Sequence, residues 1–174
     1  MAESEAESKP QALISVSDKT GIVDFAKTLL SIGFELIASS GTHKLLQQSG
    51  LTVTEVSEVT SFGELLDGRV KTLHPNIHAG ILARNTQSDL RELKENGIQP
   101  ISVVVCNLYP FKATISNSDC TLEKAIENID IGGVTLLRAA AKNYARVTVI
   151  CDPQDYGIVC EQVSLSLLVL HVFK

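Results

Sequence analysis

The stretch Ala12-Leu-Ile-Ser-Val-Ser-Asp-Lys-Thr-Gly21 decides the fold class, because a short buried strand ends there in a polar turn. Apolar residues then recur with helical spacing over 22–32, and the glycine directly after this range is a helix-ending signal. Further elements alternate along the chain, with strands expected at 34–38 and 53–56 and a helix at 44–48 between them. This βαβαβ order predicts a mainly parallel sheet with helices packed on it.

The second half of the chain continues the alternation of strands and helices. Its strongest strand is Ile101-Ser-Val-Val-Val-Cys106, which we expect to be central in the sheet because it is apolar on both faces. The last strand is expected at 146–151. Helices are expected at 90–96, 122–129 and 133–142. Residues 60–84 have weak periodicity, and we interpret them as loops and short helices with one further strand at 79–83.

The composition is that of an ordinary globular protein, and it restricts the choice of partners. Of the 174 residues, 44% are hydrophobic and 20% are charged, which excludes a disordered or low-complexity chain. The formal net charge of −5 disfavours nonspecific nucleic-acid binding, which needs a basic surface. The longest apolar run, at 165–173, is far shorter than the roughly 20 residues of a membrane span. We therefore expect neither nucleic acid nor a membrane as a partner.

We divide the chain into one domain with two tails. Residues 1–11 are polar and acidic and are expected to be a disordered tail, residues 12–160 form the domain, and residues 161–174 form a divergent apolar tail. The four cysteines are widely spaced without a C-x-x-C pair, and the chain begins without an apolar signal segment. These features favour free thiols and a cytoplasmic location.

Polar turns that follow strands are the first candidates for a binding site, because open parallel sheets bind ligands at the carboxyl ends of their strands. Ser17-Asp-Lys-Thr-Gly21 and Ser39-Ser-Gly-Thr42 each run into a helix. Free N–H groups, hydroxyls and one lysine at these positions favour a bound phosphate. Simple helix capping by Ser, Asp and Thr explains such turns as well. Neither turn fits the P-loop pattern of nucleotide hydrolases.

Two further segments carry residues suited to binding or catalysis. Arg69-Val-Lys-Thr-Leu-His-Pro75 lies in the irregular middle, and its composition is typical of a binding loop. Asp130-Ile-Gly-Gly133 leads into a helix on which Arg138 and Lys142 share a face, and its glycines permit a ligand to approach the backbone closely. A capping aspartate followed by a solvated cationic face is the alternative interpretation of this segment.

Six blocks occur in one order along the chain: Ser15-Val-Ser-Asp-Lys-Thr-Gly21, Ala38-Ser-Ser-Gly-Thr42, Gly68-Arg-Val-Lys-Thr-Leu-His-Pro75, His78-Ala-Gly-Ile-Leu-Ala-Arg84, Cys106-Asn-Leu-Tyr-Pro-Phe111 and Asp130-Ile-Gly-Gly-Val-Thr-Leu-Leu-Arg-Ala-Ala-Ala-Lys-Asn143. Together they closely resemble the N-terminal cyclohydrolase domain of bifunctional purine biosynthesis proteins. The resemblance implies a methylglyoxal-synthase-like α/β fold, with a mainly parallel sheet and helices on both faces in three layers. It also implies the last step of purine synthesis, in which 5-formamidoimidazole-4-carboxamide ribotide closes to inosine monophosphate (IMP) with loss of water.

The same resemblance, carried over position by position, implies roles for individual residues. Catalysis is implied for Lys142 as proton donor and acceptor, and for Lys71, Asp130 and Tyr109. The turn residues are implied to hold the phosphate, the loop residues to line the nucleotide and the later residues to contact the base. These implied substrate-binding residues are Ser17, Asp18, Lys19, Ser39, Ser40, Gly41, Thr42, Arg69, Val70, Lys71, Thr72, Asn107, Leu108, Asp130 and Ile131.

The resemblance implies a nucleotide as the small-molecule partner, no organic cofactor and no metal. His74 and His78 are four residues apart, but Pro75 lies between them and no third ligand of suitable spacing follows. A formyltransferase domain normally follows the cyclohydrolase domain in this family, whereas this chain stops at Lys174. We therefore expect a truncated form without formyltransferase activity, and we leave a homodimer open.

Two other functions belong to the same fold class. One is a regulatory domain that senses phosphate, and the other is a methylglyoxal-synthase-like lyase. The regulatory function predicts a phosphate turn without Lys71, Asp130 and Lys142, and all three are present. The lyase depends on acidic residues and a histidine, which the lysine-rich blocks do not match. The sequence therefore favours the cyclohydrolase.

Overall fold

Five parallel strands form the sheet of this α/β protein. The computed structural model describes residues 9–162, so residues 163–174 of the expected apolar tail and the first eight residues lie outside the described part of the chain. The strands are β1 (Gln11–Val16), β2 (Glu35–Ala38), β3 (Thr54–Glu55), β4 (Ile101–Asn107) and β5 (Thr148–Ile150). Their spatial order is β3-β2-β1-β4-β5, and every neighbouring pair is parallel. The predicted parallel sheet is thereby confirmed.

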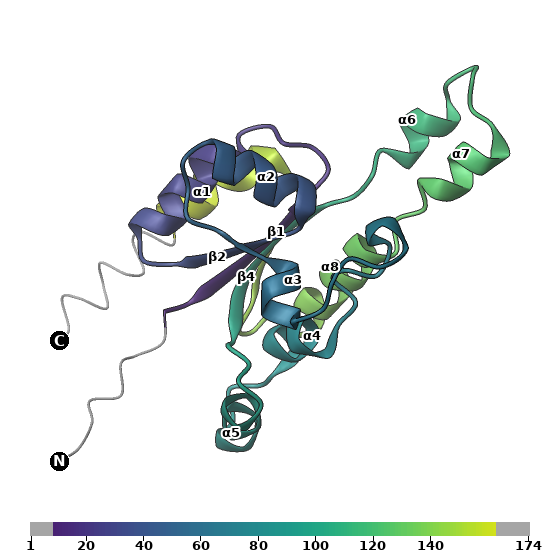
Figure 1. The fold of residues 1–174 in the computed structure, drawn as a ribbon. Helices are drawn as coiled ribbons and strands as arrows, with labels where there is room; N and C mark the ends of the chain where they lie inside the picture. Colours follow the sequence, from purple (N-terminus) through teal and green to yellow (C-terminus); the bar gives the residue numbers. More distant parts are fainter. Residues whose placement is uncertain (1–8, 163–174) are drawn as a thin grey trace, which may run out of the picture.

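Helices connect the strands and cover the sheet (Figure 1). They are α1 (Ile22–Ser31), α2 (Ser40–Gln48), α3 (Val56–Thr60), α4 (Pro75–Leu82), α5 (Gln87–Glu95), α6 (Phe111–Ile115), α7 (Leu122–Glu127) and α8 (Gly132–Lys142). Short 3₁₀ turns occur at Leu66–Gly68 and Pro153–Asp155, and a helical segment, 156–162, closes the described chain. Within residues 9–162, each helix is too short or too polar to cross a bilayer.

Hydrophobic clusters on both faces of the sheet give the molecule three layers. Along β1, Ala12 and Ile14 point to one face and Leu13 points to the other, as the period of a strand requires. The first face is covered by α1 and α2, and the second by α3, α4 and α8 (Figure 1). Because both faces are buried, the inner strands β1, β2 and β4 are mostly apolar, whereas the edge strands β3 and β5 are more exposed. The expected three-layer α/β fold is therefore confirmed.

Two expectations for the interior of the fold need correction. The strand 101–106 does lie inside the sheet as β4, but β1 takes the middle position. The strand expected at 79–83 is wrong, because these residues belong mainly to α4. Pro75 starts this helix with a φ already suited to it, and His74 caps its first turn. Ile77 and Ile81 are then buried on one face, four residues apart.

Several element boundaries also differ from the sequence expectations. Most of the turn expected at 39–42 is the first turn of α2, whose start therefore moves to Ser40. The strand expected at 53–56 is cut short by α3, and the strand expected at 146–151 shrinks to the three residues of β5. Helix α6 is not among the predicted elements. These short elements have little periodicity of their own, so packing decides their limits.

Candidate active site

A cavity of about 690 Å³ opens at the carboxyl ends of β1, β2 and β4. It lies where the chain changes direction across the sheet, because β2 flanks β1 on one side and β4 flanks it on the other. Ligands of open α/β sheets bind at such switch points, and the volume suits a small molecule. The cavity is lined by Ser15, Val16, Ser17, Lys19, Ser39, Gly41, Thr42, Asp67, Gly68, Arg69, Lys71, Thr72, Asn107, Tyr109, Ile126, Glu127, Asn128, Ile129, Asp130, Ile131, Gly132 and Gly133.

The N-terminus of α2 gives one end of the cavity the character of an anion site. Ser39 has extended backbone angles, and its side chain makes no capping hydrogen bond to the helix. Its hydroxyl lies 3.0 Å from that of Ser15 instead. Within the described residues, the backbone N–H groups of Ser40 and Gly41 have no hydrogen-bond partner. Unsatisfied N–H groups at the start of a helix favour an anion such as phosphate.

Two lysines add positive charge beside this helix terminus. Lys19 Nζ donates to the carbonyl oxygen of Val16 and to Thr42 Oγ1, the latter at 3.0 Å. Lys71 Nζ donates to Ser40 Oγ at 3.4 Å. Burial lowers the pKa of Lys19, and the positive charge of Lys71 lowers it further. A dianionic group placed between the two ammonium groups relieves this repulsion, so the end of the cavity is suited to a phosphate.

The turn after β1 is fixed by Asn107 at the end of β4. Its Oδ1 accepts hydrogen bonds from the N–H groups of Ser17 (2.6 Å) and Asp18 (2.9 Å), and its Nδ2 donates to the carbonyl oxygen of Asp18. The carboxylate of Asp18 accepts from the N–H and the hydroxyl of Thr20, and these hydrogen bonds lower its pKa. Asn107 and Asp18 therefore shape the turn that presents Lys19.

A strained loop forms part of the cavity wall. Leu66, Asp67 and Gly68 have φ values of 51°, 53° and 85°, all in the left-handed region. The two residues with side chains cost of order 1–2 kcal/mol each in this conformation. Such strain is concentrated at functional segments, and this loop carries both Arg69 and Lys71 into the cavity wall.

The N-terminus of α8 is already occupied by a carboxylate from the chain. Asp130 Oδ1 accepts a hydrogen bond from the N–H of Gly133 at 2.7 Å, and Oδ2 accepts one from the N–H of Tyr109 at 3.4 Å. A Cβ atom at Gly133 would lie 2.7 Å from Asp130 Oδ2, and a Cβ atom at Gly132 would lie 2.8 Å from Thr72 Oγ1. The two glycines therefore permit this close packing. An external anion is favoured at α2, because α8 is satisfied by Asp130.

Cys106 lies behind this end of the cavity and is not a candidate nucleophile. Its Sγ donates to the carbonyl oxygen of Gly133 at 3.7 Å. Burial, and then the charge of Asp130, raise the pKa of this thiol to about 12. All four cysteines are free, as expected from their spacing. A thiol with such a pKa is protonated near neutral pH and unreactive.

The structure brings most of the implied site residues to one cavity. The residues that line it are Ser17, Lys19, Ser39, Gly41, Thr42, Arg69, Lys71, Thr72, Asn107, Tyr109, Asp130 and Ile131. The residues that do not line it are Asp18, Ser40, Val70, Leu108 and Lys142. The Asp18 side chain is turned into its own loop, and Ser40 contacts the site through its hydroxyl and Lys71. The roles implied for these residues stay predictions.

Lys142 is the one implied catalytic residue that does not line the cavity. It is the last residue of α8 and is exposed, whereas the first residue of α8 lines the cavity. Ten residues at a rise of about 1.5 Å separate the two by roughly 15 Å. Lys142 is therefore not among the residues that line the cavity, and the rise of the helix explains its separation from Gly132.

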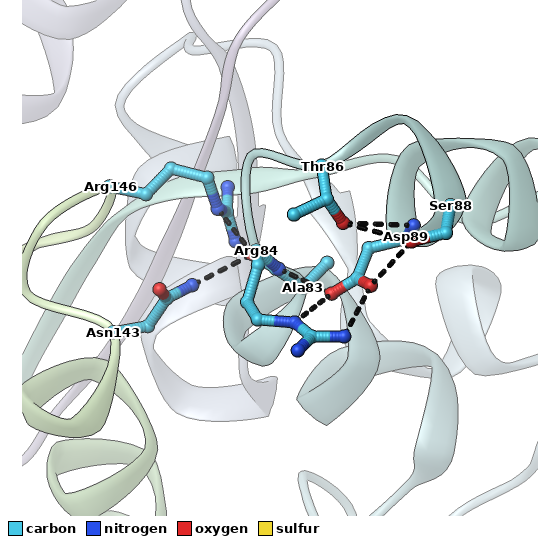
Figure 2. A network of polar contacts seen from close by, with 7 residues as sticks. All are labelled: Ala83, Arg84, Thr86, Ser88, Asp89, Asn143 and Arg146. Carbon is cyan, nitrogen blue, oxygen red and sulfur yellow. Dashed lines mark hydrogen bonds and ion pairs between the residues drawn. The ribbon is translucent and has the colours of Figure 1, made fainter.

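The residues after Lys142 anchor α4 rather than the cavity (Figure 2). Asn143 Nδ2 donates to the carbonyl oxygen of Ala83 at 2.8 Å, and Arg146 Nε donates to the same oxygen at 2.7 Å. The guanidinium of Arg146 also donates to the backbone carbonyls of Gly80, Ile81 and Ile101. Burial lowers its pKa. Arg146 therefore satisfies the carbonyl end of α4, a structural role.

The two histidines considered for a metal have other surroundings. His74 Nδ1 accepts a hydrogen bond from the N–H of Asn76 at 3.2 Å and caps α4. Burial lowers the pKa of His78, whose Nε2 is buried without a partner. In the described range, no three acidic, histidine or cysteine side chains are grouped as a metal site.

Several cavity residues were missed by the sequence analysis. Ile126, Glu127, Asn128 and Ile129 come from the end of α7 and the connection to α8. Glu127 pairs with Arg69, whose Nε lies 3.3 Å from Glu127 Oε1. No local pattern marks an exposed helix residue as part of a cavity, so only the folded chain reveals this pair.

The fold and the cavity define a class: three-layer parallel α/β proteins in which a helix N-terminus opens into a cavity at the carboxyl ends of the strands. The model of the MGS-like domain family matches residues 21–135, more than half of the chain. The chain therefore belongs to the MGS-like domain family.

Known proteins with high similarity agree with this membership. The bifunctional purine biosynthesis protein PurH of Thermoanaerobacter sp. (strain X514) is 56% identical over 155 residues, which cover 88% of this chain and 30% of the relative. The chain thus spans less than a third of that protein. The crystal structure of ForH is similar with a TM-score of 0.80 and 38% identity, covering 92% of this chain and 82% of the other.

Proposed function

We propose that this chain is an IMP cyclohydrolase of de novo purine synthesis, which closes 5-formamidoimidazole-4-carboxamide ribotide to IMP and releases water. The observation that carries the proposal is the position of Lys71 in the cavity. Its ammonium group contacts Ser40 at the anion site, and the next residue, Thr72, lies against Gly132 beside Asp130. The name of the PurH relative, a bifunctional purine biosynthesis protein, supports the same pathway.

The reaction requires proton transfers that these residues are equipped to make. The carboxamide nitrogen attacks the formyl carbon, a C–N bond forms, and the nitrogen loses a proton. The formyl oxygen takes up one proton as the ring closes and a second as it leaves as water, and the formamide nitrogen loses its own proton to form the C=N bond. We assign Asp130 as the acceptor of the carboxamide proton. We assign Lys71, once its ammonium group leaves the hydrogen bond to Ser40, as the group that stabilises the formyl oxygen. Tyr109 lines the cavity beside Asp130, whose Oδ2 accepts a hydrogen bond from the Tyr109 backbone N–H.

The phosphate end holds the substrate while the ring closes. We assign the phosphate to the start of α2 and Lys19, since this helix terminus has free N–H groups. A fixed phosphate orients the two reacting groups and reduces the entropy cost of closure. No metal or organic cofactor enters these steps, and the free cysteines fit the cytoplasm as location.

The direct test is the change in ultraviolet absorbance when the purified chain meets the formamido ribotide. Turnover to IMP supports the cyclohydrolase, whereas binding of the nucleotide without turnover supports the regulatory alternative. Binding of IMP with no turnover by an intact chain contradicts the catalytic proposal.

Measuring kcat of the Lys71→Gln and Lys142→Gln variants decides which lysine donates the proton to the formyl oxygen. The resemblance implies Lys142, and the geometry of the cavity favours Lys71. We expect Lys71→Gln to lower kcat by about 10²- to 10⁴-fold, the usual contribution of a general acid or base. A loss of this size with Lys142→Gln, at unchanged IMP affinity, returns the role to Lys142.

A further inference from the structure

The two short helices α6 and α7 form an arm beside the cavity. We define the arm as residues 111–127, and Figure 1 shows it projecting away from the three layers. Helices of five and six residues are not stable by themselves. Phe111, Ile115 and Leu122 on the arm are exposed rather than buried against the sheet. The orientation of the arm therefore depends on the contacts near its base.

An ion pair joins Glu127, at the base of the arm, to Arg69, which follows the strained loop in the cavity wall. The Arg69 guanidinium contacts both carboxylate oxygens of Glu127, so two parallel hydrogen bonds form. Both side chains also line the cavity. A two-point contact of this kind fixes the direction of a guanidinium as well as its position. The charge and hydrogen bonds of Glu127 also raise the pKa of Arg69.

The other partner, Arg69, belongs to the strained loop. It directly follows the left-handed residues 66–68 and precedes Lys71 by two positions. A loop that begins in a strained conformation needs contacts further along to hold it. The Glu127 carboxylate supplies such a contact one residue after the strained segment.

We infer that Glu127 is a positioning residue of the cavity: it orients Arg69, anchors the arm to the strained loop and so keeps Lys71 directed at the anion site. Glu127 acts through Arg69 and needs no contact with the substrate. The anchoring is independent of the reaction, but the expected effect on IMP binding rests on the proposed function.

The size of the effect follows from the exposure of the pair. The side chains of Arg69 and Glu127 are 61% and 60% exposed, so water and salt weaken their attraction. Exposed pairs shift an equilibrium by about two- to fivefold. We expect Glu127→Gln, which keeps the shape but removes the charge, to open the arm by this factor.

A matched control exists in the same molecule. Arg84 and Asp89 form a second two-point ion pair (Figure 2), in which the side chains are 73% and 17% exposed and neither residue lines the cavity. Asp89→Asn therefore removes a similar pair without touching the arm. Comparing Glu127→Gln with Asp89→Asn separates the effect of anchoring from the general loss of an ion pair.

The experiment measures three properties of the full chain: the opening of the arm, the orientation of the Arg69 guanidinium and the affinity of the cavity for IMP. Trypsin cleavage after the exposed residues Lys112 and Lys124 reports arm opening, the NMR signal of the Arg69 Nε–H reports its orientation, and calorimetry reports IMP affinity. For Glu127→Gln we expect about two- to fivefold faster cleavage, a shifted and faster-exchanging Nε–H, and a matching rise in the IMP dissociation constant. Asp89→Asn should behave as wild type in all three measurements.

Each of the other outcomes contradicts one named claim. Cleavage and an Nε–H signal equal to wild type in Glu127→Gln overturn the inference. Faster cleavage with unchanged IMP affinity means that Glu127 anchors the arm but does not position the cavity residues, which overturns that part of the inference. A wild-type chain that does not bind IMP refutes the proposed function instead, and the NMR and cleavage results then still decide whether Glu127 anchors Arg69.

Discussion

Replacing Lys19 by methionine separates the anion site from the stability of the fold. Lys19 Nζ donates to the Val16 carbonyl and to Thr42 Oγ1, and its pKa is lowered by burial and then by Lys71. The charged form is thus less favourable in the folded chain than in the unfolded chain. Lys19→Met removes this penalty together with the two hydrogen bonds. The two effects oppose each other, so we expect the free energy of unfolding to change by less than about 1 kcal/mol.

The effect on nucleotide binding should be much larger. A hydrogen bond from a charged group contributes about 1.5–3 kcal/mol, which corresponds to about a 10- to 150-fold loss in IMP affinity. The loss should be confined to the phosphate. Inosine, which lacks the phosphate, should therefore bind Lys19→Met and wild type with the same affinity.

Calorimetry with IMP and inosine, together with urea unfolding, tests this expectation. Lys27→Met is the control, because Lys27 is an exposed lysine on α1 that pairs with Asp24 far from the cavity. A loss of affinity for IMP below about threefold in Lys19→Met refutes the phosphate assignment. An equal loss for inosine refutes it as well.

The lowered pKa of Lys19 also predicts a dependence of stability on pH. Between its lowered folded pKa and its ordinary value of 10.5, the unfolded chain binds more protons at this residue than the folded chain. This residue therefore makes stability rise with pH across that alkaline window. The contribution should be absent from Lys19→Met. Urea unfolding across the window checks it, and parallel pH curves for the two proteins contradict it.

Two further substitutions test the site and its support. A Cβ at Gly41 meets no atom within 4 Å, so Gly41→Ala should keep or raise the free energy of unfolding, by up to about 1 kcal/mol, yet weaken IMP binding by filling the anion site. Calorimetry and urea unfolding check both parts, and unchanged IMP affinity contradicts the second. Arg146→Met removes the side-chain donor to the Gly80 and Ile101 carbonyls, whereas Ile81 and Ala83 keep a hydrogen bond from Asn143, and it should lower the free energy of unfolding by about 1–3 kcal/mol. A urea midpoint equal to wild type contradicts this role.

Local signals carried most of the fold prediction, and they failed where elements are short. The apolar runs in β1 and β4 and the helical spacing in α1 are strong signals because they extend over several residues. Residues 79–83 are apolar over too short a run to distinguish a strand from a helix. The cap at His74 and the packing of Ile77 and Ile81 settle that segment as a helix.

The candidate site was likewise predicted in part from the sequence and in part only from the structure. The resemblance and the glycine-containing turns pointed to Lys19, Lys71 and Asp130, which do share one cavity. Matching a motif gives a residue's place in the sequence but not its distance from a ligand. For this reason the resemblance alone did not reveal that Lys142, at the end of the predicted helix, does not line the cavity.

By itself, the sequence determined the parallel α/β class and the edge of the sheet that bears the cavity. Both follow from periodicity and from polar turns after strands, which are properties of neighbouring residues. Only the tertiary structure decided which helix terminus is open to an anion, because Asp130 fills the start of α8 and nothing fills that of α2 within the described residues. It alone paired Arg69 with Glu127, which are 58 residues apart. Contacts between distant loops depend on strand order and helix packing, and no local pattern contains them.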